Sequence, residues 1–235
     1  MNNKAEEKNT KQQVLTHAEA VVTYILSILF VWIAVLRLYG EINHTDNLVD
    51  VRFFGSKLLG LFLIIGMILA HRFTDMKVNW KGVSGTREDL KKSLIWGLVM
   101  GIIVTAVLFG FRQYLNTLKP ENREVPAFGL YLTTNTRWFY PVNIPFQEFF
   151  IKCFIQDNFR KLFPGRHKHL SVLMTSALFF VLHLQYPFHY MVGAALLCLV
   201  TGYLYEKYPT IWGPVIVHFA IGFLPRSFGI FQIIE

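Results

Sequence analysis

The chain has 235 residues, of which 53% are hydrophobic and 16% are charged, and its formal net charge is +8. A soluble globular domain carries nearer a quarter charged residues, so this composition argues against that class and indicates a membrane protein. The lysines and arginines gather between apolar segments, where they indicate topology, and we expect no nucleic-acid partner.

Apolar segments predict an all-α fold, a polytopic transmembrane helix bundle with about seven spans. The first segment, 21–38, is too long for the apolar region of a cleaved signal peptide, and no small-residue cleavage pattern follows it. Segment 93–111 contains no charged residue. A stretch of about 18 apolar residues is long enough to cross a bilayer. The remaining spans are expected at 53–70, 138–156, 170–186, 190–205 and 210–225.

The predicted organisation has three parts: a polar, mobile cytoplasmic tail over 1–17, N-terminal spans over 18–137, and a core over 138–235. Basic residues cluster before the first span and in alternate loops after it, so the positive-inside rule predicts a cytoplasmic N-terminus and, with seven spans, an external C-terminus. The chain is expected to lie in the cell membrane as a multi-pass protein. Segment 125–140 is open to interpretation as a re-entrant or interfacial piece.

Four ionisable residues fall inside predicted spans: Glu148, Lys152, His183 and His218. Such residues are costly in lipid, usually face the bundle interior, and often mark function. Counting about 1.5 Å per residue from the inner span edges places Glu148 and His218 about 14 Å deep and His183 about 20 Å deep. The similar depths predict one shared site, although hydrogen-bonded bundle histidines and a neutralised acid–lysine pair would explain the same residues structurally.

Local spacing adds further expectations. Glu148 and Lys152 are four residues apart and therefore share a helix face. Pro145 is expected near a helix start, where the helix dipole would favour a nearby carboxylate. The histidines outside the spans are expected to be solvated or interfacial, and the cysteines to be small apolar core residues. These are His167, His169 and His189, and Cys153 and Cys198.

Three short motifs occur in order within 141–224. They read Gln147-Glu148-Phe-Phe-Ile-Lys152, Phe179-Phe-Val-Leu-His183 and His218-Phe-Ala-Ile-Gly222. In these motifs, and in the segment "GAALLCLVTGYLYEKYPTIWGPVIVH" that ends at His218, the chain resembles the CAAX-processing and bacteriocin-processing (Abi) intramembrane protease family. That family has two adjacent glutamates followed after three residues by arginine, then Phe-x-x-x-His, and finally His-x-x-x-Asn or a variant.

The resemblance implies an intramembrane endopeptidase that hydrolyses a membrane-associated peptide or protein. Glu148 would act as base or metal ligand, while His183 and His218 would orient water or stabilise the oxyanion. The resemblance leaves the cofactor open: zinc held by Glu148, His183 and His218, or a metal-free glutamate mechanism. Supporting positions are Gln147, Lys152, Phe179 and Gly222.

Three departures from the family pattern keep alternatives open. Gln147 stands where the family has a glutamate, Lys152 where it has arginine, and Gly222 where it has asparagine. A catalytically inactive relative that binds a membrane peptide, as an immunity or scaffold protein, is therefore the alternative function. A small transporter or proton relay is less favoured, because the sequence shows no inverted repeat.

Overall fold

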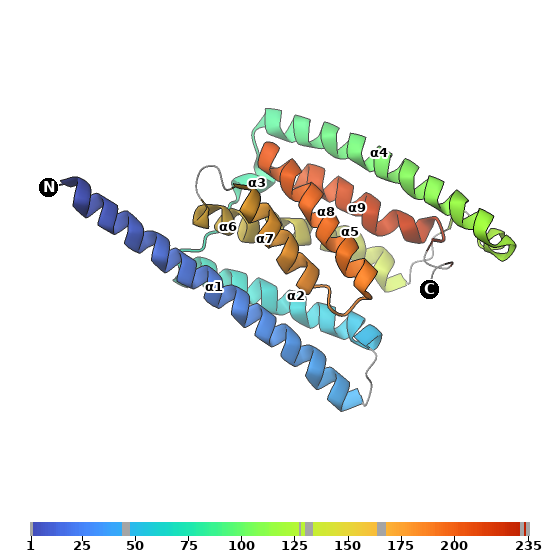
Figure 1. Cartoon of the computed structure of the whole chain (residues 1–235), viewed down its shortest axis with the longest axis horizontal. Coiled ribbons are helices and arrows are strands. Elements are labelled where there is room, and N and C mark those ends of the chain that lie inside the picture. The colour runs from blue at the N-terminus through green and yellow to red at the C-terminus, as the bar shows by residue number, and fades with distance from the viewer. Residues whose placement is uncertain are drawn as a thin grey trace. The chain divides into compact units, whose positions relative to one another are not determined.

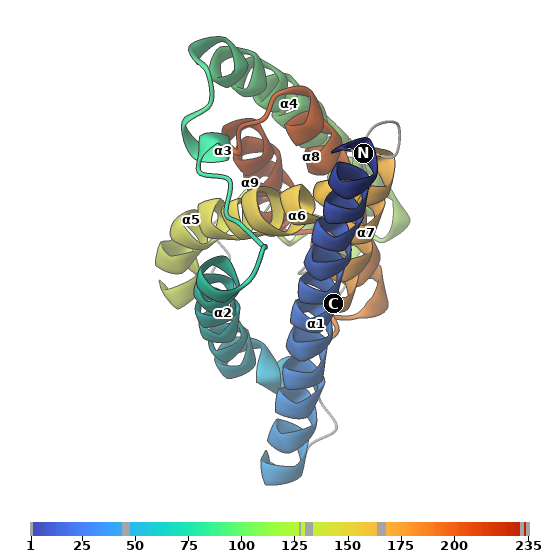
Figure 2. The same cartoon turned by 90° about the vertical axis from the view of Figure 1, so that its left-hand side faces the viewer.

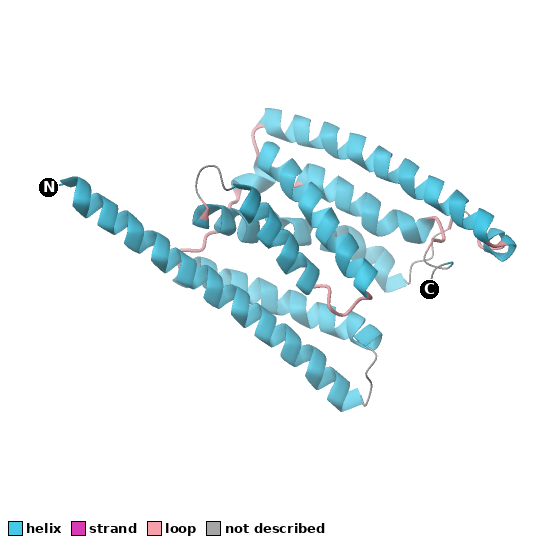
Figure 3. Cartoon of the chain, viewed as in Figure 1, coloured by secondary structure: helices cyan, strands magenta, loops and turns pink. Residues whose placement is uncertain are grey.

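The computed structural model describes residues 2–43, 48–126, 128–129, 134–163, 168–230 and 233. Within these residues all regular secondary structure is helical and no strand occurs (Figure 3). The prediction of an all-α fold is confirmed. The elements are α1 (Asn2–Asn43), α2 (Leu48–Phe73), α3 (Lys81–Ser84), α4 (Arg87–Leu118), η1 (Pro120–Arg123), α5 (Thr134–Glu148), η2 (Phe149–Gln156), α6 (Asp157–Leu162), α7 (Lys168–Val181), α8 (Phe188–Lys207) and α9 (Trp212–Ser227).

The chain forms two compact units. The first combines Met1–Asn79 with Cys153–Leu199, and the second combines Trp80–Lys152 with Val200–Glu235. In the first unit α1 packs against α2 and α6, and α6 packs against α7 (Figure 2). In the second unit α4 runs along α9, and α5 packs against α9 (Figure 1). The boundary expected at residue 138 stays a prediction.

Several helices have the length and composition of membrane spans. Within the part of the chain that the structure describes, three are long and apolar enough to cross a bilayer, namely Thr16–Glu41, Arg87–Leu118 and Phe188–Lys207. They cover the predicted spans 21–38, 93–111 and 190–205. The shorter apolar helices Leu58–Phe73 and Lys168–Val181 overlap the predicted spans 53–70 and 170–186. The two remaining predicted spans, 138–156 and 210–225, fall on α5–η2 and on α9.

Helix α4 shows the polarity expected of a helix in lipid. It begins after Thr86, whose hydroxyl accepts a hydrogen bond from the Asp89 backbone N–H at 3.1 Å and so caps the first turn. Along the rest of the helix, large apolar side chains are exposed, among them Ile102 at 68% and Val107 at 64%. A water-soluble helix would bury such side chains, whereas lipid solvates them as well as another helix does.

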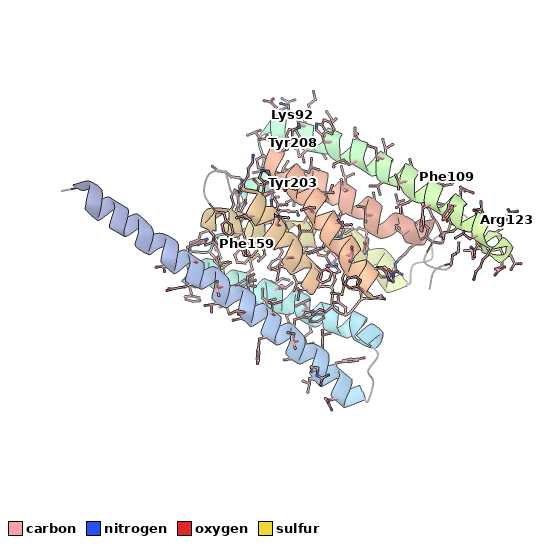
Figure 4. All side chains as sticks on the ribbon, viewed as in Figure 1. Lys92, Phe109, Arg123, Phe159, Tyr203 and Tyr208 are labelled. Atoms are coloured by element: carbon pink, nitrogen blue, oxygen red, sulfur yellow. The ribbon has the colours of Figure 1, made fainter. Side chains whose placement is uncertain are left out.

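In the first half of α4 the buried residues are small: Ser93, Gly97 and Gly101. A Cβ added at Gly97 would lie 2.7 Å from the Cα of Gly213, so the backbones of α4 and α9 approach too closely for a side chain. The Gly213 backbone N–H donates to the Ser93 hydroxyl at 3.0 Å. Small residues at a helix crossing allow this approach and the van der Waals contact that holds membrane helices together. Farther along α4, Phe109 packs edge-on against Phe228, with ring centroids 5.9 Å apart (Figure 4).

Asn158 joins the short segment after α2 to α6 in the first unit. Its side-chain oxygen accepts from the Lys77 backbone N–H at 3.1 Å, and its amide donates to the Lys77 carbonyl at 3.0 Å. His17 Nε2 lies 3.1 Å from the Asn158 carbonyl and connects α1 to the same point. Asn158 is fully buried, so these polar groups satisfy one another away from solvent.

Some local expectations are corrected and others hold. Pro145 lies inside α5, so its expected place near a helix start is wrong. Residues 2–17 are helical because α1 begins at Asn2, and their mobility stays a prediction. His169 and His189 are exposed, and both cysteines are buried, as expected. His167 and residues 127 and 130–133 of segment 125–140 lie outside the described residues.

Candidate active site

Glu148, the acid of the first motif, lies where the helical hydrogen-bond pattern changes. Glu148 is the last residue of α5, and the π-helix η2 follows it directly. Pro141 and Pro145 interrupt α5 from within, because proline has no N–H to donate to the carbonyl four residues earlier. A mid-helix stretch of π geometry often accompanies a functional site. The change of pitch thus occurs beside a buried carboxylate.

Glu148 and His218 form a direct contact in the second unit. Glu148 Oε1 lies 2.7 Å from His218 Nδ1, and the residues are only 3% and 6% exposed. An ionised carboxylate can only accept hydrogen bonds, so Nδ1 carries the proton when Glu148 is charged. The similar depths predicted for these two residues, seventy positions apart in the chain, agree with this contact. Their catalytic role stays a prediction.

The second oxygen of Glu148 has a different environment. Oε2 is buried and has no hydrogen-bond partner among the described residues. Lys152, 0% exposed, follows one turn later and interacts electrostatically with Glu148. A buried charge is tolerated when an opposite charge or a hydrogen bond compensates it. Two groups therefore hold the carboxylate: Lys152 through its positive charge, and His218 through the contact with Oε1. Oε2 is able to accept a proton.

The other supporting positions of the second unit are Gln147 and Gly222. Gln147 is half-buried next to Glu148 in the chain, and an amide cannot act as a base. Gly222 lies one turn beyond His218 on α9, and a Cβ built there would overlap the hydroxyl of Tyr140 on α5. The hydroxyl of Tyr140, from α5, thus occupies the space in which the family's asparagine side chain would begin.

Phe179 and His183 belong to the first unit; Phe179 lies in the last turn of α7, and His183 lies in the turn that follows the helix. His183 Nδ1 lies 2.7 Å from the Phe179 carbonyl, and the two rings are 4.5 Å apart. The ring centroid of Tyr186 lies 5.7 Å from that of His183. The intact second motif therefore fixes its own histidine through the residue one turn earlier. That His183 shares a site with Glu148 stays a prediction.

The geometry of the acid–histidine pair bears on whether zinc would fit. Zinc ligand atoms at about 2.0–2.2 Å in tetrahedral arrangement lie more than about 3 Å from each other. The 2.7 Å between Glu148 and His218 is instead a hydrogen-bond distance. Among the described residues no group of three or more His, Cys, Asp or Glu side chains could hold a metal ion. These atoms do not fit a zinc centre as arranged, and the mechanism below uses no metal.

Tyr140 lies against Gly222 of the third motif but belongs to none of the three motifs. It lies eight positions before Glu148 in a segment interpreted as re-entrant or interfacial, and no motif includes it. Its ring is half-buried and packs near Phe219, with centroids 6.3 Å apart. The signal available was Gly222, since a glycine in place of a larger residue indicates that something else fills the space.

Residues 129–224 match the family described as type II CAAX prenyl endopeptidase Rce1-like. The match includes all three motifs together with Tyr140. No curated protein and no solved structure matches the chain. The resemblance inferred from the motifs is confirmed for this part of the chain.

Proposed function

We propose, on the premise that residues 129–224 form an Rce1-like domain, that the protein is an intramembrane endopeptidase. A CAAX-type membrane protease is the kind of function that the domain supports. The finer proposal is that Glu148 is the general base and that His218 orients it. The observation that carries this proposal is the buried Glu148 carboxylate, bonded to His218 through Oε1 and without a hydrogen-bond partner at Oε2 among the described residues.

The chemistry follows from this pair. A water hydrogen-bonded to Oε2 would attack the carbonyl carbon of a peptide bond while Glu148 takes its proton. The carbonyl π electrons move onto oxygen and give a tetrahedral oxyanion. When the carbonyl re-forms, the C–N bond breaks, and the leaving nitrogen takes the proton back from Glu148. The products are a carboxylic acid and an amine, and no metal or redox partner takes part.

The neighbouring groups would each contribute to that cycle. His218 would hold one carboxylate oxygen and so fix the direction of the other. Lys152 would compensate the negative charge of the buried Glu148 carboxylate. His183 is proposed to stabilise the oxyanion, with Phe179 positioning it, and Gln147 is proposed to hold the substrate through its amide. The substrate class is a peptide or protein associated with the membrane.

The test is cleavage of a fluorogenic peptide library by the purified protein in detergent or nanodiscs. Glu148→Gln is expected to lower kcat by about 10²–10⁴-fold, the usual contribution of a general base. Glu88→Gln, an exposed acid on α4, is the matched control and should leave kcat unchanged. Cleavage that survives in the Glu148 variant would refute the assignment of the base.

The same assay tests the alternative function. If the wild-type protein binds peptides but cuts none, and Gln147→Glu creates cleavage, then the first motif has lost its base. The protein would then be a non-catalytic relative that binds a membrane peptide.

A chelator distinguishes the two mechanisms that the family resemblance left open. Because Glu148 and His218 lie at hydrogen-bond distance, we expect kcat to be unchanged after prolonged incubation with a strong zinc chelator. Metal content measured on the same sample shows whether zinc was present at the start. Activity that disappears with the chelator and returns with zinc would contradict the metal-free mechanism.

A further inference from the structure

Outside the candidate active site, a lysine and two aromatic side chains of the second unit gather where α4 begins and α8 ends. Lys207 is the last residue of α8, and its Nζ lies 5.3 Å from the ring centroid of Trp96 on α4 and 5.3 Å from that of Tyr208. An ammonium within about 6 Å of an aromatic ring is attracted by the electrons of the ring face. We call these three residues the Lys207 cluster. Lys92 lies near Tyr208 at the same end of α4 (Figure 4).

The Lys207 cluster is open to its surroundings. Lys207 is exposed, Trp96 is 45% exposed and Tyr208 is half-buried. Within the described part of the chain, the Lys207 ammonium, the Trp96 indole N–H and the Tyr208 hydroxyl each lack a hydrogen-bond partner. All three groups are donors, so the cluster is suited to a ligand that carries several acceptor oxygens.

The acidic side chains at this end of the helices have other partners. Glu88 forms an ion pair with Lys92 at 2.5 Å, and the Asp89 carboxylate accepts a hydrogen bond from the Thr86 hydroxyl at 2.7 Å. Glu206 also has an interaction. No carboxylate among the described residues forms an ion pair with Lys207. The aromatic rings attract its ammonium but do not neutralise it, so the cluster keeps a positive charge.

The position of the Lys207 cluster along the helices is typical of residues at the level of lipid headgroups. Lys207 ends the apolar helix Phe188–Lys207, and Trp96 lies in the first third of Arg87–Leu118; both helices are long and apolar enough to cross a bilayer. Tryptophan, tyrosine and lysine are frequent near the ends of such helices, because their apolar parts rest among acyl chains while their polar ends reach the headgroups.

The charge of the cluster selects among headgroups. A headgroup with a net negative charge would supply both the counter-charge and the acceptor oxygens that the protein does not provide. The cation of a choline headgroup would instead compete with the Lys207 ammonium for the same two rings. An anionic phospholipid therefore fits the cluster better than a zwitterionic one.

We propose that the Lys207 cluster binds the phosphate headgroup of an anionic phospholipid, with Lys207 as the charged contact and Tyr208 and Trp96 as hydrogen-bond donors. The positive-inside rule predicts that this end of α4 faces the cytoplasm, where anionic lipids give the membrane surface a negative potential. The proposal does not depend on peptide cleavage, because none of the three residues belongs to the motifs that carry the proposed endopeptidase.

A purely structural role for Lys207 makes a different prediction. If the ammonium only holds the end of α8 against α4 through the rings, its removal should lower the unfolding temperature equally in anionic and zwitterionic bilayers. If the ammonium binds a headgroup, the wild-type protein should be more stable in anionic bilayers, because a ligand that binds the folded state stabilises it. The Lys207→Gln variant should then lose that difference.

The experiment uses the full chain in nanodiscs of phosphatidylcholine with or without phosphatidylglycerol. Native mass spectrometry measures the affinity for phosphatidylglycerol, and thermal unfolding measures stability. Lys207→Gln should weaken phosphatidylglycerol binding by about fivefold or more. Tyr208→Phe keeps the ring and removes only the hydroxyl, and it should weaken binding by at least about threefold. The control Lys119→Gln removes the same charge at the other end of α4 and should bind like wild type.

Three outcomes would overturn the proposal. The first is phosphatidylglycerol binding by Lys207→Gln within about twofold of wild type. The second is an equal loss in Lys207→Gln and Lys119→Gln, which would indicate attraction by overall charge rather than a site. The third is an increase in unfolding temperature with inorganic phosphate, in phosphatidylcholine nanodiscs, as large as that with phosphatidylglycerol, because the ligand would then be a soluble anion.

Discussion

Burying Glu148 in a membrane helix costs free energy of folding. Burying an ionised carboxylate costs several kcal/mol even after relaxation, and a hydrogen bond and a nearby cation recover only part of that cost. His218 and Lys152 supply that compensation in the second unit. An apolar trio of similar size would pack the same space at least as well. The cluster is therefore better explained by chemistry than by stability.

The acid and the histidine are expected to act as one unit. Glu148→Gln and His218→Ala should each lower kcat by at least about 10²-fold, and the double variant should be no worse than the more damaging single variant. The measurement is a double-mutant cycle on kcat, with unfolding temperatures recorded for all proteins. Losses that multiply in the double variant would mean that the two residues act independently.

At this scale the sequence predicted the residues but not all of their partners. Counting residues from span edges placed Glu148 and His218 at a similar depth, although the π-helix η2 lies between Glu148 and the span edge at Asp157. The same arithmetic could not identify Tyr140, since its contact with Gly222 depends on how closely two helices cross. Crossing distance is set by packing of side chains far apart in the sequence.

Helices α4 and α9 are held by contact between their backbones. Gly97 and Gly213 meet where neither could carry a side chain without displacement, and Ser93 bonds to the Gly213 N–H beside them. In lipid there is little hydrophobic gain when two helices meet, so close van der Waals contact and hydrogen bonds decide their association. Positions 97 and 213 are thus points at which this pair of helices is sensitive to the size of a side chain.

Gly97→Ala is expected to destabilise the protein by about 1–3 kcal/mol, the usual effect of overpacking. Gly110→Ala on the same helix is the matched control, because a Cβ there meets nothing within 4 Å and alanine favours helix. Unfolding in detergent can be followed with a thiol-reactive dye, since Cys153 and Cys198 are both buried. An unchanged unfolding midpoint for Gly97→Ala would show that α4 and α9 can move apart to admit the added methyl group without loss of stability.

The sequence predicted helices best where the length of an uncharged apolar run is sufficient to identify a span. The span 93–111 is uncharged throughout, and it lies within α4. The expected span 138–156 falls instead on two elements, the end of α5 and the π-helix η2, and that it crosses the membrane stays a prediction. Pro145 was misplaced. Proline inside a membrane helix is tolerated because neighbouring groups satisfy the freed carbonyls, and those neighbours are not visible in a local sequence pattern.

At the scale of the whole molecule, the distribution of basic residues predicts which loops lie in the cytoplasm. Asp75 follows α2 among cationic neighbours, whereas Glu121 lies in η1 beyond the end of α4, so the predicted topology puts them on opposite sides. Both are exposed. The matched family fixes neither the membrane nor the orientation, which therefore rest on the positive-inside rule.

This orientation can be measured with a membrane-impermeant maleimide on intact cells. Glu121→Cys should be labelled directly, and Asp75→Cys only after the membrane is permeabilised. The wild-type protein is the background control, since its two cysteines are buried. The reverse labelling pattern would invert the topology, and labelling of both sites in intact cells would contradict the predicted span between them.

The inverted polarity of α4 has a thermal consequence. Hydrophobic attraction in water weakens on cooling because it depends on the entropy of hydration. The contact at Gly97 and Gly213 lies in a helix whose apolar side chains face outward, so its strength comes from atoms touching rather than from water released. The contact between α4 and α9 is therefore not expected to weaken as the bilayer cools. The lowest temperature at which the protein functions would then be set by stiffening of the surrounding lipid.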